Sequence, residues 1–138
     1  MIKEISPQQA WELLQANADA ILLDVRSTVE YYYVGHPSGS IHIPLKEAPD
    51  WANDENFVEK VLSALTNKAK EVEIIVSQPV LIICRSGKRS MEAAEELNRH
   101  GFKEIYNIAE GFEGDRDENN HRSTINGWRF HNLPWEQT

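Results

Sequence analysis

Apolar residues along the chain fall into two kinds of segment that alternate. Five short runs have the length and composition of strands, at residues 2–5, 20–25, 40–43, 80–83 and 102–108. Other apolar residues recur every three or four positions, as at Ala10, Leu13 and Leu14, which is typical of helices with one buried face. This alternation predicts an α/β fold, in which a parallel sheet is covered by helices on both faces. Ligands of such sheets bind beyond the carboxyl ends of the strands.

Polar residues mark where several of these elements begin. Ser6 before Pro7 predicts the start of the first helix, and Ser27 followed by Glu30 is a capping box that predicts a short helix over 28–33. Turn residues predict a loop over 35–39. An amphipathic helix is expected from about Asn53, and a polar connector over 67–73. Residues 74–76 fit either a small extra strand or a lead-in to the next strand, and the pattern does not decide between them.

Cys84, the only cysteine, directly follows the uninterrupted apolar run at 80–83. A strand without alternation is typically buried on both faces. Apolar residues at helical spacing resume at Met91, and Gly101 is a typical C-terminal stop, so a helix is expected to begin near Gly87. Cys84 is therefore expected at the carboxyl end of a strand, facing the amino terminus of a helix.

This position suits an anion or a thiolate. Free amide groups and the helix dipole supply partial positive charge there, and the loop adds the cations Arg85, Lys88 and Arg89. Both effects favour the thiolate form of Cys84, which is the nucleophilic form. The alternative, a buried structural thiol, is common for a cysteine after an apolar run, but it leaves the basic loop unexplained.

Length and composition limit the kind of protein. A chain of 138 residues with 41% apolar and 26% charged residues predicts a single domain, residues 1–138, and no apolar run approaches membrane-spanning length. The net charge of −8 argues against binding to nucleic acid or anionic membranes. Residues 1–7 lack the apolar core of a signal peptide, so a cytoplasmic location is expected.

Metal and disulfide chemistry are not expected. One cysteine excludes an internal disulfide and a thiolate-rich zinc site, and the five histidines lack ligand spacing: His36, His42, His100, His121 and His131. We expect no metal and no organic cofactor.

The ordered motifs resemble the rhodanese, or sulfurtransferase, family from about Ile5 to Trp135. The residues that carry the resemblance are Asp24-Val25-Arg26, Gly35-His36 with Gly39, the loop Cys84-Arg85-Ser86-Gly87-Lys88-Arg89-Ser90, Gly101-Phe102, Tyr106-Asn107-Ile108, Gly111, Trp128 and Leu133-Pro134-Trp135. The resemblance implies a three-layer fold whose five-stranded, mostly parallel sheet is flanked by helices on both faces.

The same resemblance implies an activity. Cys84 would take a sulfane sulfur from a small anionic donor, thiosulfate or a persulfide, and pass it to cyanide, to a thiol or to a sulfur-carrier protein. The residues implied to bind the donor are Arg85, Ser86, Gly87, Lys88, Arg89 and Ser90, and those implied to support the site are Asp24, Arg26 and His36. For Asp24 and Arg26 we expect an internal ion pair that fixes the loop rather than a direct catalytic role.

Two departures from the family pattern affect the expected site. Pro37-Ser38-Gly39-Ser40 replaces the usual Ile-Pro-Gly-Ala, and Glu30 lies one residue further from Gly35 than is common, which leaves open whether Glu30 pairs with Arg26. The segment 113–127 is longer than the ending of a minimal relative, and its role is open.

Three other functions compete with thiosulfate turnover. A cysteine phosphatase or arsenate reductase of related fold needs an arginine at the sixth position after the cysteine, where this chain has Ser90 and carries Arg89 one place earlier. A non-catalytic rhodanese-like binding module commonly lacks the cysteine, which is present here. A sulfur relay to a protein thiol uses the same Cys84 loop, and the sequence does not separate it from thiosulfate turnover.

Overall fold

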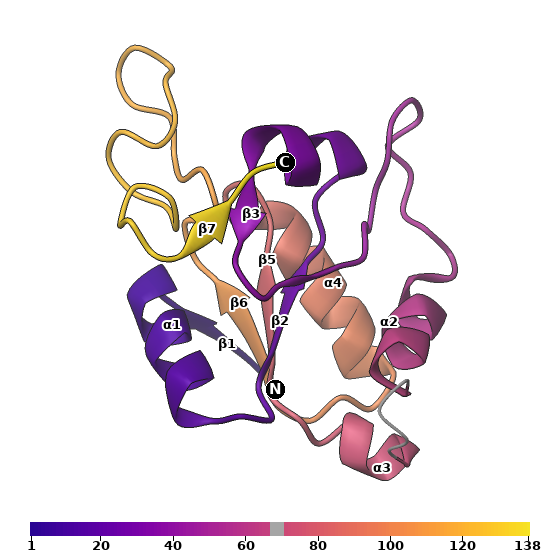
Figure 1. Cartoon of the computed structure of the whole chain (residues 1–138). Helices are drawn as coiled ribbons and strands as arrows, with labels where there is room; N and C mark the ends of the chain where they lie inside the picture. Colours follow the sequence, from indigo (N-terminus) through magenta and orange to yellow (C-terminus); the bar gives the residue numbers. More distant parts are fainter. Residues whose placement is uncertain (67–70) are drawn as a thin grey trace.

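The computed structural model, which describes residues 1–66 and 71–138, is built on a five-stranded sheet. The strand order is β1 (Ile2–Ile5), β6 (Ile105–Ile108), β5 (Val80–Ile83), β2 (Ile21–Asp24) and β4 (Ile41–His42), and every neighbouring pair is parallel. The expectation of a mostly parallel sheet is confirmed. Because the strands are parallel, their carboxyl ends meet at one edge, which lies at the top of Figure 1.

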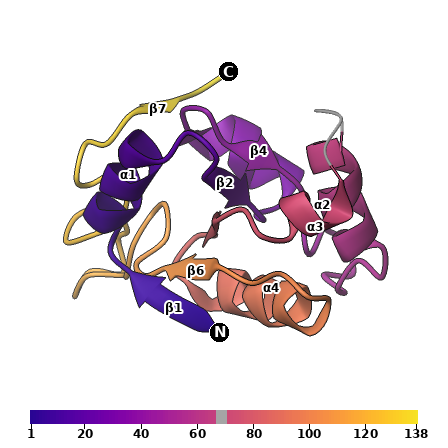
Figure 2. The same ribbon diagram turned by 90° about the horizontal axis from the view of Figure 1, so that it is seen from below.

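Helices cover both faces of this sheet, as the three-layer prediction requires (Figure 2). One face packs against α1 (Pro7–Ala16) and buries Ala10, Leu22 and Leu81. The other face packs against α2 (Phe57–Thr66), α3 (Val72–Ile75) and α4 (Lys88–Arg99). All four side chains of β5 are buried, so this central strand is apolar because it contacts a core on each side.

Several predicted boundaries hold. Ser6 caps α1 by accepting a hydrogen bond from the Gln9 N–H, with Pro7 as the first helical residue. The capping box at Ser27 and Glu30 is present, and the short helix expected over 28–33 is found over 28–34, where all but the first two residues form the π-helix η1 (Glu30–Val34). The strand at the end of the apolar run 102–108 is confined to β6, since residues 102–104 lead into it.

Four local predictions are corrected. The loop expected at 35–39 contains β3 (His36–Pro37), which pairs antiparallel with β7 (Trp135–Glu136). The helix expected from about Asn53 begins at Phe57, because Asp54 first holds a turn whose carboxylate accepts the Asn56 N–H. Residues 74–75 belong to the short helix α3, so the extra-strand alternative is wrong. Of the connector expected over 67–73, residues 67–70 lie outside the described residues and Val72 already starts α3.

Candidate active site

Cys84 lies immediately after β5, and the next residues curl around its sulfur. The Gly87 N–H donates a hydrogen bond to Cys84 Sγ at 3.1 Å, and Ser90 Oγ lies 3.3 Å from the same sulfur. Gly87 has φ 106° at the residue that precedes α4, a conformation that disfavours any side chain. The expected arrangement, a thiol between a strand end and a helix start, is present.

Asn107 on β6 orients the hydroxyl of Ser90. The amide nitrogen of Asn107 donates to the Gly87 carbonyl, so its oxygen faces Ser90 and accepts the Ser90 hydroxyl proton. A lone pair of Ser90 Oγ is thereby left toward Cys84 Sγ. Asn107 is only 1% exposed, and this buried amide holds both ends of the turn that surrounds the sulfur.

The chain that follows β6 supports the cysteine loop from behind. The Phe112 N–H donates to the Cys84 carbonyl at 2.8 Å, and the Glu113 N–H donates to the Arg85 carbonyl at 3.0 Å. Gly111 makes this approach feasible, because a Cβ at that position would lie 2.5 Å from the Arg85 backbone. The Cys84 loop is therefore fixed by backbone hydrogen bonds as well as by its own turn.

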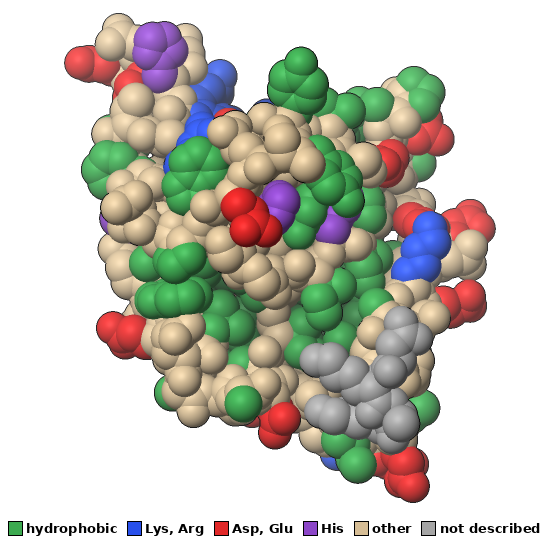
Figure 3. Space-filling view, in the orientation of Figure 1, with side chains coloured by type: hydrophobic (Ala, Val, Ile, Leu, Met, Phe, Trp, Pro, Cys, Tyr) green, Lys and Arg blue, Asp and Glu red, His purple; other side chains and the backbone are tan. Residues whose placement is uncertain are grey.

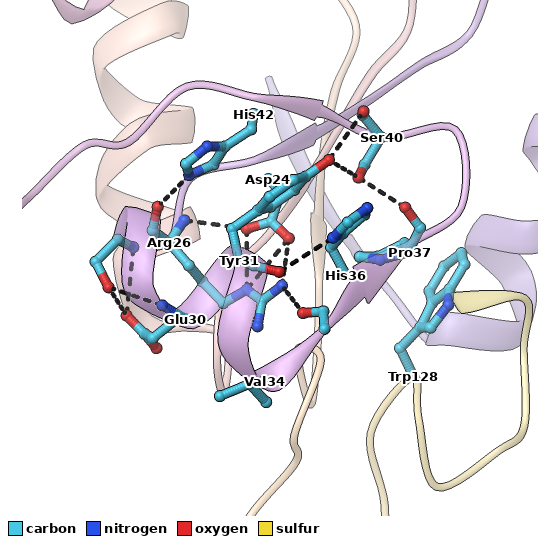
Figure 4. Close-up of polar contacts among 12 residues, drawn as sticks. Asp24, Arg26, Glu30, Tyr31, Val34, His36, Pro37, Ser40, His42 and Trp128 are labelled. Carbon is cyan, nitrogen blue, oxygen red and sulfur yellow. Dashed lines mark hydrogen bonds and ion pairs between the residues drawn. The ribbon is translucent and has the colours of Figure 1, made fainter. Parts of the chain in front are cut away.

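Asp24 and Arg26 form the internal ion pair that was expected (Figure 4). The guanidinium donates to the Asp24 carboxylate and to the Gly35 carbonyl at 2.7 Å, and both side chains are fully buried. Arg26 also lies over the Phe112 ring, 4.4 Å from its centroid. The pair thus connects the end of β2, the turn at Gly35 and the segment behind the Cys84 loop.

Glu30 pairs with Arg89 and not with Arg26, which settles the question left open by its spacing. The two guanidinium nitrogens of Arg89 donate to the two carboxylate oxygens of Glu30 at 2.7 and 2.8 Å. Burial opposes ionisation of Glu30, but hydrogen bonds and charge from Arg89, with hydrogen bonds from Ser27, outweigh it and lower the pKa of Glu30 from 4.5 to about 2. Arg89 is therefore already neutralised by a bidentate partner.

His36 contacts the region beside the site. Its ring stacks on Tyr31 with centroids 3.9 Å apart, and Nδ1 lies 3.0 Å from the Tyr31 carbonyl (Figure 4). The ring of His42 stacks on the other face of Tyr31, and His36 Nε2 lies 3.3 Å from Glu136 on β7. Among the described residues, the contacts of His36 thus tie η1 to β3 and β7 and do not reach the Cys84 loop.

A cavity of about 780 Å³ lies against the Cys84 loop. It is lined by the loop residues Arg85 and Arg89 and by residues of three other segments. Two arginines of the cavity, Arg85 and Arg122, form no ion pair with any described residue. Burial and the nearby charge of Arg85 lower the pKa of Arg122, which places the two cations within each other's field.

The predicted donor-binding residues are therefore brought together only in part. Gly87 and Ser90 contact the sulfur, and Arg85 lines the cavity. Lys88 is exposed and does not line this cavity, and Ser86 is half-buried in the turn.

Sequence reasoning missed Asn107, Trp51 and Arg122 as site residues. Asn107 stands among the family-like motifs without a role, and no local pattern marks the other two, which come from long loops.

Comparison with known proteins places the chain in a family. A model of the rhodanese-like domain matches residues 6–118, and the chain belongs to this family of domains. A thiosulfate sulfurtransferase GlpE from Glaesserella parasuis is 31% identical over 111 residues, covering 80% of this chain and 83% of its own. The crystal structure of Rv0390 from M. tuberculosis superposes with a TM-score of 0.81 at 34% identity, over 99% of this chain and 98% of that chain.

Other relatives extend over the full length of the chain. An uncharacterised protein from Rickettsia rickettsii, a homologue of RP600, is 31% identical over 138 residues, 98% of each chain. Within residues 1–66 and 71–138, no helix has the length and apolar character of a membrane span, and no group of three or more histidine, cysteine or acidic residues has the geometry of a metal site.

Proposed function

We propose that this protein is a sulfurtransferase that carries sulfur as a persulfide on Cys84. The observation that carries the proposal is the sulfur's environment: Cys84 Sγ accepts the Gly87 N–H, lies beside Ser90 Oγ and precedes Arg85, an arginine without a carboxylate partner among the described residues. Membership of the rhodanese-like family and similarity to a thiosulfate sulfurtransferase support it.

The proposed first step is attack of the Cys84 thiolate on the outer sulfur of thiosulfate. A new S–S bond forms at Sγ, the S–S bond of thiosulfate breaks, and its electron pair leaves with sulfite. Negative charge accumulates on the departing sulfite and on the outer sulfur. Arg85 would stabilise the former, and amide groups of the 84–90 turn would stabilise the latter.

The proposed second step regenerates the enzyme. The persulfide anion left by the first step takes a proton from water and becomes Cys84–S–SH. A thiolate acceptor attacks its outer sulfur, and the electron pair of the breaking S–S bond returns to Cys84 Sγ. The acceptor leaves as its own persulfide, R–S–SH, and keeps the proton. The two steps need no oxidant, reductant or organic cofactor. Ser90 Oγ, whose own proton goes to Asn107, lies where it can accept a hydrogen bond from the thiol of Cys84.

The site offers no comparable support for phosphatase chemistry. The residue at the sixth position after Cys84 is Ser90, which is buried against the sulfur, and the guanidinium of Arg89 is held by Glu30. A tetrahedral phosphate at this loop would therefore lack the forked arginine contact at the position where such enzymes need it.

Intact-mass measurement after incubation with thiosulfate tests the proposal. The wild-type protein should gain one sulfur atom, cyanide should remove it, and Cys84→Ser should show neither change. Sulfite should appear in the same amount as the bound sulfur. An unmodified wild-type protein that hydrolyses a generic phosphate ester would overturn the assignment.

A further inference from the structure

The cavity beside Cys84 is much larger than thiosulfate requires. Its volume of about 780 Å³ lies within the range of about 300–1,000 Å³ typical of sites that hold organic molecules. Thiosulfate is a compact dianion without any apolar surface. The remaining volume therefore calls for a larger ligand in at least one of the two half-reactions.

The charges of the cavity are unequally satisfied. Glu30 is neutralised by Arg89, and Glu113 lies 4.0 Å from Arg129. Glu47 accepts two hydrogen bonds of 2.6 Å from the neutral groups of Thr28 and keeps its negative charge, so the two remaining arginines outnumber it. Once these partners are assigned, Arg85 and Arg122 remain as cations that line the cavity without a carboxylate partner among the described residues.

Arg122 is held in place by its own segment. Its Nη1 donates to the Gly114 carbonyl at 2.6 Å, at the point where the segment 113–127 leaves the Cys84 loop. Asn126 closes the same segment by accepting the Asp115 N–H and donating to its carboxylate. In the space-filling view this segment projects at the upper left, and basic side chains lie along the side of it that faces the rest of the molecule (Figure 3).

The remaining wall of the cavity is apolar. Val29, Ala48 and Trp51 line it, and the Val29 and Trp51 side chains stay 69% and 47% exposed. Exposed apolar groups beside a cavity gain free energy when an apolar ligand covers them, because water is displaced from both surfaces. The cavity thus combines two cations with an apolar wall, against the loop that holds the Cys84 sulfur.

We infer that the sulfur acceptor is a small organic thiol that carries a carboxylate, which Arg122 and Arg85 bind while Trp51 covers its apolar part. This inference rests on the proposed function, since the acceptor reacts with the Cys84 persulfide. The same cations then serve twice, first for the sulfonate of the donor and afterwards for the carboxylate of the acceptor. Arg122 is a specificity-determining residue that lies outside the Cys84 loop.

Matched acceptors test the charge. With thiosulfate as donor, kcat/KM is measured for 3-mercaptopropionate and for its neutral amide, 3-mercaptopropionamide. Wild-type protein should favour the carboxylate by about tenfold at low salt, and the preference should shrink as ionic strength rises. Arg122→Gln should remove most of it, whereas Arg116→Gln, an exposed change in the same segment, should keep the wild-type ratio. The ratio of the two kcat/KM values is compared between wild type and each variant, so the difference in pKa between the two thiols cancels from the effect of the substitution.

A second pair of variants tests the apolar wall. Trp51→Ala should lower kcat/KM for 4-(mercaptomethyl)benzoate about threefold to tenfold more than for 3-mercaptopropionate, and Tyr33→Ala, which removes an exposed aromatic ring outside the cavity, should lower neither.

The outcomes separate the two proposals. A wild-type protein that forms the Cys84 persulfide but shows no preference for the carboxylate, or a preference that Arg122→Gln leaves intact, would overturn the acceptor assignment alone. Absence of the persulfide itself would overturn the proposed function.

Discussion

Two arginine–carboxylate pairs belong to the region of the Cys84 loop, and they differ in burial. Asp24–Arg26 is fully buried, whereas the Glu30 and Arg89 side chains are 17% and 16% exposed and line the cavity. A buried pair is costly to break because one charge is left without water or partner, whereas a pair at a cavity wall is partly solvated. The comparison indicates that the Asp24–Arg26 pair stabilises the fold and that the Glu30–Arg89 pair fixes part of the cavity wall.

The largest expected effect follows from breaking the buried pair. Asp24→Asn should lower the free energy of unfolding by about 3–5 kcal/mol, because it leaves the Arg26 charge buried and uncompensated. Urea unfolding at pH 7 measures the loss. The double variant Asp24→Leu with Arg26→Met removes both charges and should recover much of the stability, while a loss below about 1 kcal/mol for Asp24→Asn would contradict the role given to the pair.

The pair at the cavity should have a smaller, pH-dependent effect. The pKa of Glu30 in the folded protein is about 2, below the ordinary value of 4.5. Ionised Glu30 therefore stabilises the fold above pH 4.5, and this contribution is lost as the pH falls toward 2. Glu30→Gln should cost about 1–3 kcal/mol at pH 7. The difference in unfolding free energy between wild type and variant should narrow through that window; a difference that is constant from pH 7 to pH 3 would show that the ionised pair is not its source.

An exposed pair provides the lower end of the same scale. Arg99 donates to Glu96 on the surface of α4, where the two side chains are 61% and 37% exposed. Arg99→Gln should change the unfolding free energy by less than about 0.5 kcal/mol, since water screens the pair and the free side chains regain entropy. If Arg99→Gln lowered the unfolding free energy as much as Glu30→Gln, burial would not explain the differences among the three ion pairs.

Local patterns predicted the parts of the molecule that depend on nearby residues. The unbroken apolar run of β5, the capping box at Ser27 and the helix start after Gly87 are each encoded within a few positions. The alternation of strands and helices predicts that the sheet is parallel, but not the order of its strands. The ion pair of Asp24 and Arg26 could also be predicted, because the two residues are only two positions apart in the sequence.

Contacts between distant residues were not predicted. Glu30 and Arg89 are 59 positions apart, and either could have paired elsewhere. The strands β3 and β7 have two residues each, too few to show alternation of apolar and polar residues. Their pairing joins residues 100 positions apart, so no local pattern indicates it. Arg122 lies in a segment with no apolar periodicity at all, so only the folded chain shows that it lines the cavity.

The segment that carries Arg122 both leaves and rejoins the same short stretch of backbone. It departs after Phe112, whose N–H holds the Cys84 carbonyl, and it returns where Trp128 N–H donates to the Gly111 carbonyl and Gly127 N–H to the Glu110 carboxylate. The Cys84 loop and the segment 113–127 are therefore both anchored to the backbone of residues 110–112. Under the proposed function, insertions, deletions or exchanges between residues 115 and 125 would change which molecules the site accepts and leave the backbone support of Cys84 in place, so that selectivity and catalysis could evolve separately.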